Sequence, residues 1–95
     1  MAAYMIFTRL KTTDQSEMDT YAGLAGGTLA GRPVTPHVRY GEQETLEGPS
    51  TEGTVIVSFP TKADALDWYN SPEYTAARAH RIAGSEYMVT VIEGV

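Results

Sequence analysis

Three stretches of the chain, at 3–10, 54–59 and 87–92, are rich in the β-branched, aromatic and aliphatic residues that favour β-strands. The two alternating sets of the first stretch are Tyr4, Ile6, Thr8 and Leu10 on one face and Ala3, Met5, Phe7 and Arg9 on the other. A strand with one wet face alternates apolar with polar residues, whereas here both sets are largely apolar. The last stretch shows the same pattern. We therefore expect both faces of these strands to be covered.

A second strand along the chain is predicted over 34–40. Simple alternation places His37 and Arg39 on one of its faces and Val38 and Tyr40 on the other. The chain then reaches the strand at 54–59 through a short predicted strand over 43–46 and a Gly- and Pro-rich loop over 47–53.

The first predicted helix begins at Asp14, which forms a capping-box pattern with Glu17. Its apolar positions recur at helical spacing and form one stripe: Met18, Tyr21, Ala25 and Leu29. Three glycines, at positions 23, 26 and 27, disfavour a regular helix. We expect the helix to end near them, or other backbone to approach it closely there.

Two further helices are predicted on either side of Asn70. Thr61 can cap the first, whose apolar positions are Ala65, Leu66, Trp68 and Tyr69. Ser71 as N-cap and Pro72 at the first helical position open the second, which Gly84 closes. Tyr74, Ala77, Arg78 and Arg81 share a face of this last helix.

The resulting order is β-α-β-(β)-β-α-α-β, which is the split βαβ pattern. It predicts an α+β fold over residues 1–95, a single ferredoxin-like domain with an antiparallel sheet and helices on one face. The other sheet face would be bare although it is apolar. An uncovered apolar face of this size indicates an interface, so we expect a two-fold homodimer whose sheets stack face to face.

Composition narrows the class of protein. The formal net charge is -5 and only 7 residues are Lys or Arg, which opposes nucleic-acid binding. Cysteine is absent, and the two histidines lack the carboxylate spacing of a metal site, so we expect no metal. No stretch reaches the roughly 20 apolar residues of a membrane span, and the first residues do not have the pattern of a signal peptide. The expectation is a cytoplasmic protein.

The run Trp68-Tyr69-Asn70-Ser71-Pro72-Glu73-Tyr74, together with Phe59-Pro60 before it and Arg81 after it, resembles the domain-of-unknown-function family 1330. Supporting matches are Arg39-Tyr40-Gly41, Leu46-Glu47-Gly48 and Glu93-Gly94. The resemblance implies a small protein of the dimeric α+β barrel superfamily with a pocket between sheet and helices. Relatives in that superfamily include cofactor-free oxygenases, isomerases, lyases and simple ligand binders, so no cofactor is expected.

Arg39 is the first candidate for binding a ligand, because a guanidinium offers a planar fork of donors to a carboxylate or enolate. The alternative is a salt bridge to Glu73 or Glu93. His37, expected beside Arg39, is the better acid–base candidate of the two histidines, although a surface histidine is commoner. His80 is expected on an exposed helix face.

The aromatic run supplies the other candidates. Tyr69 and Tyr74 can line a pocket, with Arg81 on the same helix face as Tyr74, whereas Trp68 is better explained as core. Asn70 can bind a substrate or end its helix. Glu73 can act as a general base or simply complement the helix dipole in the first turn.

Two functions follow from these residues. The first is a cofactor-independent enzyme acting on a small anionic or carbonyl-bearing metabolite, with Arg39, Tyr69, Asn70, Tyr74 and Arg81 in binding and His37 or Glu73 in proton transfer. The second is a non-catalytic ligand-binding or sensing dimer that uses the same pocket.

Overall fold

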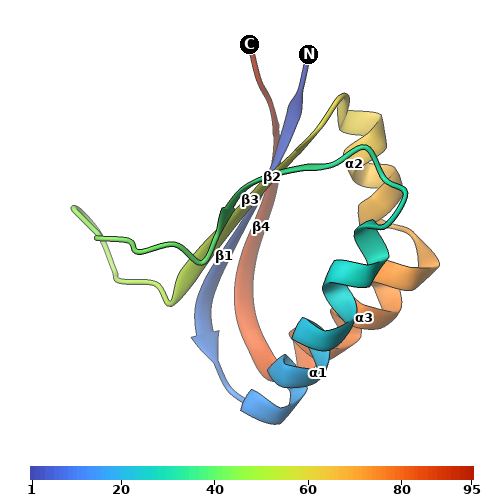
Figure 1. Ribbon diagram of the computed structural model, residues 1–95. Coiled ribbons are helices and arrows are strands. Elements are labelled where there is room, and N and C mark those ends of the chain that lie inside the picture. Colours follow the sequence, from blue (N-terminus) through green and yellow to red (C-terminus); the bar gives the residue numbers. More distant parts are fainter.

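Four antiparallel strands and three helices make up the computed structural model, which describes residues 1–95. The strands are β1 (Ala3–Thr12), β2 (Thr35–Arg39), β3 (Gly53–Phe59) and β4 (Ser85–Glu93), in the sheet order β2-β3-β1-β4. The helices are α1 (Gln15–Ala25), which continues into the 3-10 helix η1 (Gly26–Leu29), α2 (Lys62–Tyr69) and α3 (Pro72–Gly84). All helices cover one face of the sheet, as Figure 1 shows. The predicted ferredoxin-like α+β fold is confirmed.

The helix start signals act as predicted, with one difference. Asp14 Oδ1 accepts hydrogen bonds from the backbone N–H groups of Ser16 and Glu17, and Thr61 and Ser71 cap α2 and α3 in the same way. Glu17 does not complete a capping box. Its carboxylate instead lies 2.7 Å from Nδ1 of His80, so His80 joins α3 to α1 and is not a free surface side chain.

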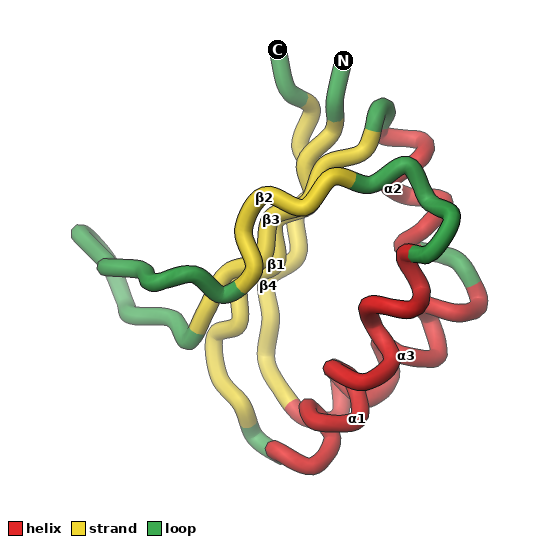
Figure 2. Tube along the Cα trace, in the orientation of Figure 1, coloured by secondary structure: helices red, strands yellow, loops and turns green.

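The short strand predicted over 43–46 is wrong. Residues 40–52 form a loop that projects beyond the sheet on the side away from the helices (Figure 2). The side chain of Gln43 holds the base of this loop, since its amide donates to Thr51 and its carbonyl accepts from the Thr54 hydroxyl. The side-chain amide of Gln43 thus makes the hydrogen bonds between the two sides of the loop, in place of a backbone ladder.

A β-bulge in β2 overturns the expectation that His37 and Arg39 share a face. Pro36 pairs with Val57 and Val38 with Ile56, so His37 is an extra residue with no partner on β3. His37 lies on the open face, where its Nε2 is 2.7 Å from Ser58 Oγ and its ring is 5.6 Å from that of Tyr4. Arg39 pairs with Val55 and faces the helices.

The core lies between the sheet and the helices. Met5, Phe7, Val57 and Phe59 of the sheet pack there against Ala65, Trp68, Tyr74 and Ala77 of the helices. On the opposite face, Ile6 and Ile56 are half-buried, and Met88 and Ile92 are 59% and 54% exposed. The helices thus leave an apolar sheet face uncovered. None of the helices has the length and apolar character needed to cross a bilayer.

Gly84 is expected to be irreplaceable at the contact between α3 and the start of α1. A Cβ at Gly84 would lie 2.8 Å from the carbonyl oxygen of Asp14 and 2.7 Å from Cβ of Glu17, and the Gly84 carbonyl accepts from the N–H groups of Thr13 and Asp14. Gly84→Ala should therefore lower the free energy of unfolding by about 1–3 kcal/mol through overpacking. Urea unfolding measures it.

Gly23→Ala is the matched control. No atom lies within 4 Å of a Cβ at Gly23, which is exposed in α1. Alanine there should raise the free energy of unfolding by about 0.5–1 kcal/mol through helix propensity. Equal effects of the two substitutions would contradict the steric explanation.

Candidate functional site

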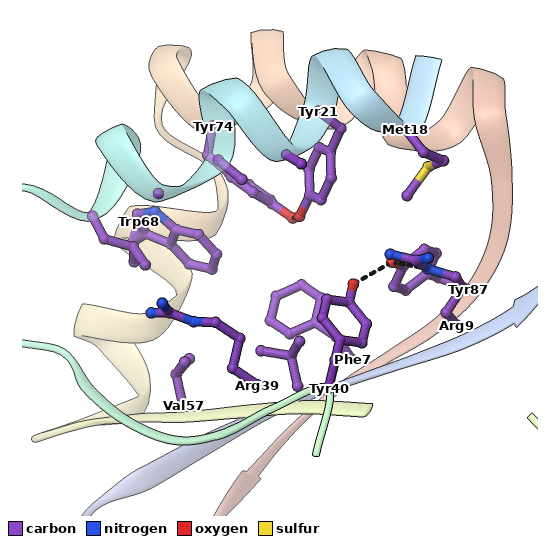
Figure 3. Close-up of a pocket in the computed structure, with 15 residues that line it drawn as sticks. Phe7, Arg9, Met18, Tyr21, Arg39, Tyr40, Val57, Trp68, Tyr74 and Tyr87 are labelled. Atoms are coloured by element: carbon purple, nitrogen blue, oxygen red, sulfur yellow. Dashed lines mark hydrogen bonds between the residues drawn. The ribbon is translucent and has the colours of Figure 1, made fainter. Parts of the chain in front are cut away.

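A cavity of about 380 Å³ lies between the sheet and the first helix (Figure 3). Its floor is formed by the strand residues Phe7, Val55 and Val57, and its roof by Met18, Tyr21, Ala22, Ala25, Gly26 and Leu29. Trp68 and Tyr74 close one end. The small residues of the roof leave room over the sheet, and no side chain or backbone crowds Gly23, Gly26 or Gly27. Only Gly26 of these glycines lines the cavity, and the close backbone approach considered from the sequence is absent.

One pair of tyrosine hydroxyls lies in the helical wall. The hydroxyl oxygens of Tyr21 and Tyr74 are 2.7 Å apart. Burial raises the pKa of both phenols, so each keeps its proton and can donate a hydrogen bond. The ring of Tyr74 is fixed by Trp68, whose ring centroid is 4.1 Å away. The Trp68 indole also donates to Thr28 Oγ1 at 3.1 Å, and this hydrogen bond holds η1 against the Trp68 and Tyr74 side chains.

A second pair lies on the sheet side of the cavity. The hydroxyl oxygens of Tyr40 and Tyr87 are 2.6 Å apart, and Arg9 Nε donates to the Tyr87 hydroxyl at 2.8 Å. Burial, reinforced by the hydrogen bond to Tyr40, raises the pKa of Tyr87 to about 12. Desolvation works against the charge of Arg9, but the hydrogen bonds with Tyr87 and Tyr40 outweigh it and raise the pKa of the guanidinium. Tyr87 is therefore a neutral phenol beside a permanent cation.

The backbone at Tyr40 is held in an uncommon conformation. Its φ of 50° lies in the left-handed region, which bulky residues rarely adopt. The N–H of Tyr40 donates to the Thr54 carbonyl at 2.9 Å, and Arg9 lies 4.6 Å above the ring. Only glycine fits opposite, because a Cβ at Gly53 would lie 2.5 Å from Tyr40 Cδ1. The fold thus maintains a costly conformation that directs this hydroxyl to Tyr87.

Arg39 lines the cavity beside Trp68 (Figure 3) and forms neither of the salt bridges considered from the sequence, to Glu73 or to Glu93. Two of the fifteen lining residues are arginines and none is acidic. The cavity is thus positively charged in a chain whose net charge is -5. It offers donors and positive charge surrounded by apolar walls.

Arg81 lies directly behind this wall. The residue is only 5% exposed, and its Nε has no hydrogen-bond partner. Its guanidinium stacks 4.9 Å from the ring centroid of Tyr87, and its positive charge opposes the burial that raises the pKa of Tyr74. No carboxylate pairs with Arg81, so it adds positive charge next to both tyrosine pairs.

The other residues singled out from the sequence lie away from the cavity. His37 is on the opposite sheet face, and Glu73 is exposed in the first turn of α3. Tyr69 is half-buried beneath the guanidinium of Arg78, 4.4 Å from its ring centroid. Asn70 ends α2 beside a shallow surface depression. Of the predicted ligand contacts, Arg39 and Tyr74 line the cavity.

Sequence reasoning overlooked Arg9, Tyr21, Tyr40 and Tyr87 as site residues. For Arg9 a signal was present, since it continues the strand face of Met5 and Phe7 and so brings a cation onto the core side. A buried cation requires a partner or a function. The structure contains no group of three His, Asp or Glu side chains placed to hold a metal ion.

The fold and the cavity define a ferredoxin-like α+β protein with a pocket of ligand size between sheet and helices. The chain belongs to the family described as domain of unknown function (DUF1330), whose model matches residues 2–95. No curated protein matches the sequence.

Solved structures share the fold. The chain is similar to the RPA0582 protein of unknown function from Rhodopseudomonas palustris, at 16% identity and a TM-score of 0.78, over 99% of this chain and 82% of that chain. It is similar to a dimeric, ferredoxin-like protein of unknown function from Bacteroides fragilis, at 14% identity and a TM-score of 0.70, over 98% and 96%. It is also similar to SnoaB, a cofactor-independent oxygenase from Streptomyces nogalater, at 8% identity and a TM-score of 0.58, over 99% of this chain and 92% of that chain. At these identities the likeness shows the fold alone.

The cavity tyrosines should make the protein less stable at alkaline pH. In the unfolded chain they ionise near pH 10, whereas in the fold the pKa of Tyr21 and Tyr74 is raised and that of Tyr87 reaches about 12. Between these values the folded state holds protons that the unfolded state has lost, so the free energy of unfolding falls as pH rises. Urea unfolding followed by tryptophan fluorescence above about pH 9 checks this. Tyr21→Phe and Tyr87→Phe should flatten the dependence, and an unchanged slope in both would contradict it.

Proposed function

We propose that this protein binds a small molecule with an apolar, ring-like body and an anionic or carbonyl oxygen in the cavity between sheet and helices. The observation that carries the proposal is the charge of the cavity, which has two arginines and no carboxylate in a protein of net charge -5. Arginines that line a cavity without a carboxylate partner favour an anionic guest, because a guanidinium makes its strongest hydrogen bonds to an anion.

The shape and lining of the cavity support the same class of ligand. Its volume of about 380 Å³ lies within the range of small-molecule pockets. Phe7, Trp68 and the tyrosine rings supply flat apolar surfaces against which a ring can pack. Arg39 supplies a planar fork for a carboxylate or carbonyl oxygen at one side of that surface.

Binding is the function that the geometry supports best, ahead of catalysis. His37 and Glu73, the two groups considered for proton transfer, lie outside the cavity. The lining contains no histidine and no carboxylate, and burial raises the pKa of Tyr21, Tyr74 and Tyr87, which makes these phenols donors and not bases. Arg39, Tyr74 and the Arg9–Tyr87–Tyr40 group are therefore proposed as ligand contacts.

Arg39→Ala should weaken the binding of an aromatic carboxylate by about 1.5–3 kcal/mol, since a hydrogen bond to a charged group is lost. The probe is 2-naphthoate, measured by titration calorimetry, with the uncharged 2-naphthalenemethanol in parallel. Binding of the uncharged probe should change little.

Arg32→Ala is the matched control, because Arg32 forms an exposed salt bridge with Asp67 outside the cavity. Its affinity for 2-naphthoate should equal that of the unaltered protein. The proposal is wrong if 2-naphthoate does not bind, or if Arg39→Ala and Arg32→Ala behave alike.

We also infer that the protein is a homodimer through the sheet face that the helices leave open. The half-buried and exposed apolar residues of that face support it, as does the description of similar structures from Bacteroides fragilis and Thermobifida fusca as dimeric. Face-to-face stacking of two such sheets would remove Ile6, Ile56, Met88 and Ile92 from water.

Light scattering at micromolar concentration should give the mass of a dimer. Met88→Asp should shift it to a monomer, because a carboxylate on this apolar sheet face would be buried in the interface without a partner. Ile82→Asp is the control, since Ile82 is 65% exposed on α3 and away from the sheet face. A monomeric unaltered protein would contradict the inference.

A further inference from the structure

The two tyrosine pairs of the cavity have the same construction. One pair, Tyr40 and Tyr87, receives a hydrogen bond from the guanidinium of Arg9. The other pair, Tyr21 and Tyr74, has the guanidinium of Arg81 behind it. Figure 3 shows the hydroxyl oxygens of the two pairs on opposite walls, directed toward the space between them.

Each pair has one hydrogen-bond donor more than it uses. Two phenols carry two O–H groups, and their mutual contact at 2.6 or 2.7 Å consumes only one of them. No other protein acceptor contacts these four hydroxyls in the structure, so one O–H of each pair is free for a ligand or for solvent, which Tyr40 also reaches because it is 42% exposed. A single acceptor placed between the two walls could receive both of these spare donors.

Positive charge accompanies the two surplus donors. Arg81 is 5% exposed with an unpartnered Nε, and Arg9 makes its hydrogen bond only to an uncharged phenol. A buried guanidinium without a counter-charge, as at Arg81, is costly. The partly exposed Arg9 stacks on the same Tyr87 ring, at 5.8 Å from its centroid against 4.9 Å for Arg81. The left-handed backbone conformation of Tyr40 adds a second free-energy cost beside the same tyrosine pair. An anion bound between the pairs would offset the charge of both arginines.

We propose that the space between the Tyr21–Tyr74 and Tyr40–Tyr87 pairs is a subsite for a single oxyanion, and that the ligand is an enol or phenol held there as its anion. The proposal rests on the function proposed above and specifies the ligand class. Two single O–H donors from opposite walls suit one oxygen atom, whereas a carboxylate is better served by the planar fork of Arg39. On binding, the O–H bond of the ligand breaks heterolytically, its electron pair stays on the oxygen and the proton passes to solvent water.

The test uses 4-nitrophenol, whose phenolate absorbs visible light and whose neutral form does not. The pH titration of the probe in excess protein gives the acid dissociation constant of the bound form. The subsite should raise that constant about tenfold or more over the free probe, since each hydrogen bond to a charged oxygen contributes on this scale. Tyr21→Phe and Tyr40→Phe should each reduce phenolate affinity about tenfold, while affinity for the uncharged isostere 4-nitroanisole changes by less than about twofold.

Tyr69→Phe is the matched control, because it removes a phenol hydroxyl near the cavity end wall that does not line the cavity. It should leave the phenolate affinity unchanged. Arg81→Met should lower phenolate affinity without a matching loss for 4-nitroanisole, and the two tyrosine variants test the subsite even where that variant does not fold.

The outcomes separate this inference from the proposed function. If 2-naphthoate binds through Arg39 but bound 4-nitrophenol is no more acidic than the free probe, the oxyanion subsite is wrong and the binding function stands. The same holds if Tyr21→Phe and Tyr40→Phe behave like Tyr69→Phe. If neither probe binds, both the subsite and the binding function are wrong.

Discussion

Trp68 connects the sheet, α3 and η1 through a single side chain. Its indole stacks on Phe59 of the sheet with ring centroids 5.8 Å apart, packs against Tyr74 of α3 and donates to Thr28 of η1. A large aromatic side chain supplies much of the apolar burial that a 95-residue chain can achieve. By filling one end of the space between sheet and helices, Trp68 sets the depth of the cavity beside it. The site therefore depends on a core contact.

The polar part of the cavity departs from what stability alone would favour. Arg81 is buried without a carboxylate and with an unpartnered Nε, and Tyr40 has a positive φ. Each departure costs free energy, and all of them surround one space. Local rules of folding are broken mainly where a function requires it. The concentration of these costs at a single place argues for a ligand more strongly than the shape of the cavity does.

The sequence predicted the fold because its signals are local. Ser71 and Pro72 fix the junction of α2 and α3 by capping and by the geometry of proline, and two-sided apolar strands indicate a sheet covered or paired on both faces. It could not predict the bulge at His37, since a single extra residue leaves no mark in composition yet reverses every face after it. For this reason Arg39 lies on the cavity side of β2, whereas His37 lies on the open face of the sheet. The tyrosine pairs were likewise invisible, because Tyr21 and Tyr74 are 53 positions apart and Tyr40 and Tyr87 are 47 apart.

The alternation of side chains also connects the two proposed surfaces. In β1, Met5, Phe7 and Arg9 face the helices and the cavity, while Tyr4, Ile6 and Thr8 face the open side. Arg9 pairs with Gly53 and Tyr87 on the neighbouring strands, and Thr8 pairs with Thr54 and Met88 one position away. The same strands that carry the proposed ligand contacts therefore form the face proposed for the dimer. A second copy stacked on that face would hold β1, β3 and β4 in register from behind. Pairing of subunits would in this way stiffen the floor of the cavity without contributing a side chain to it.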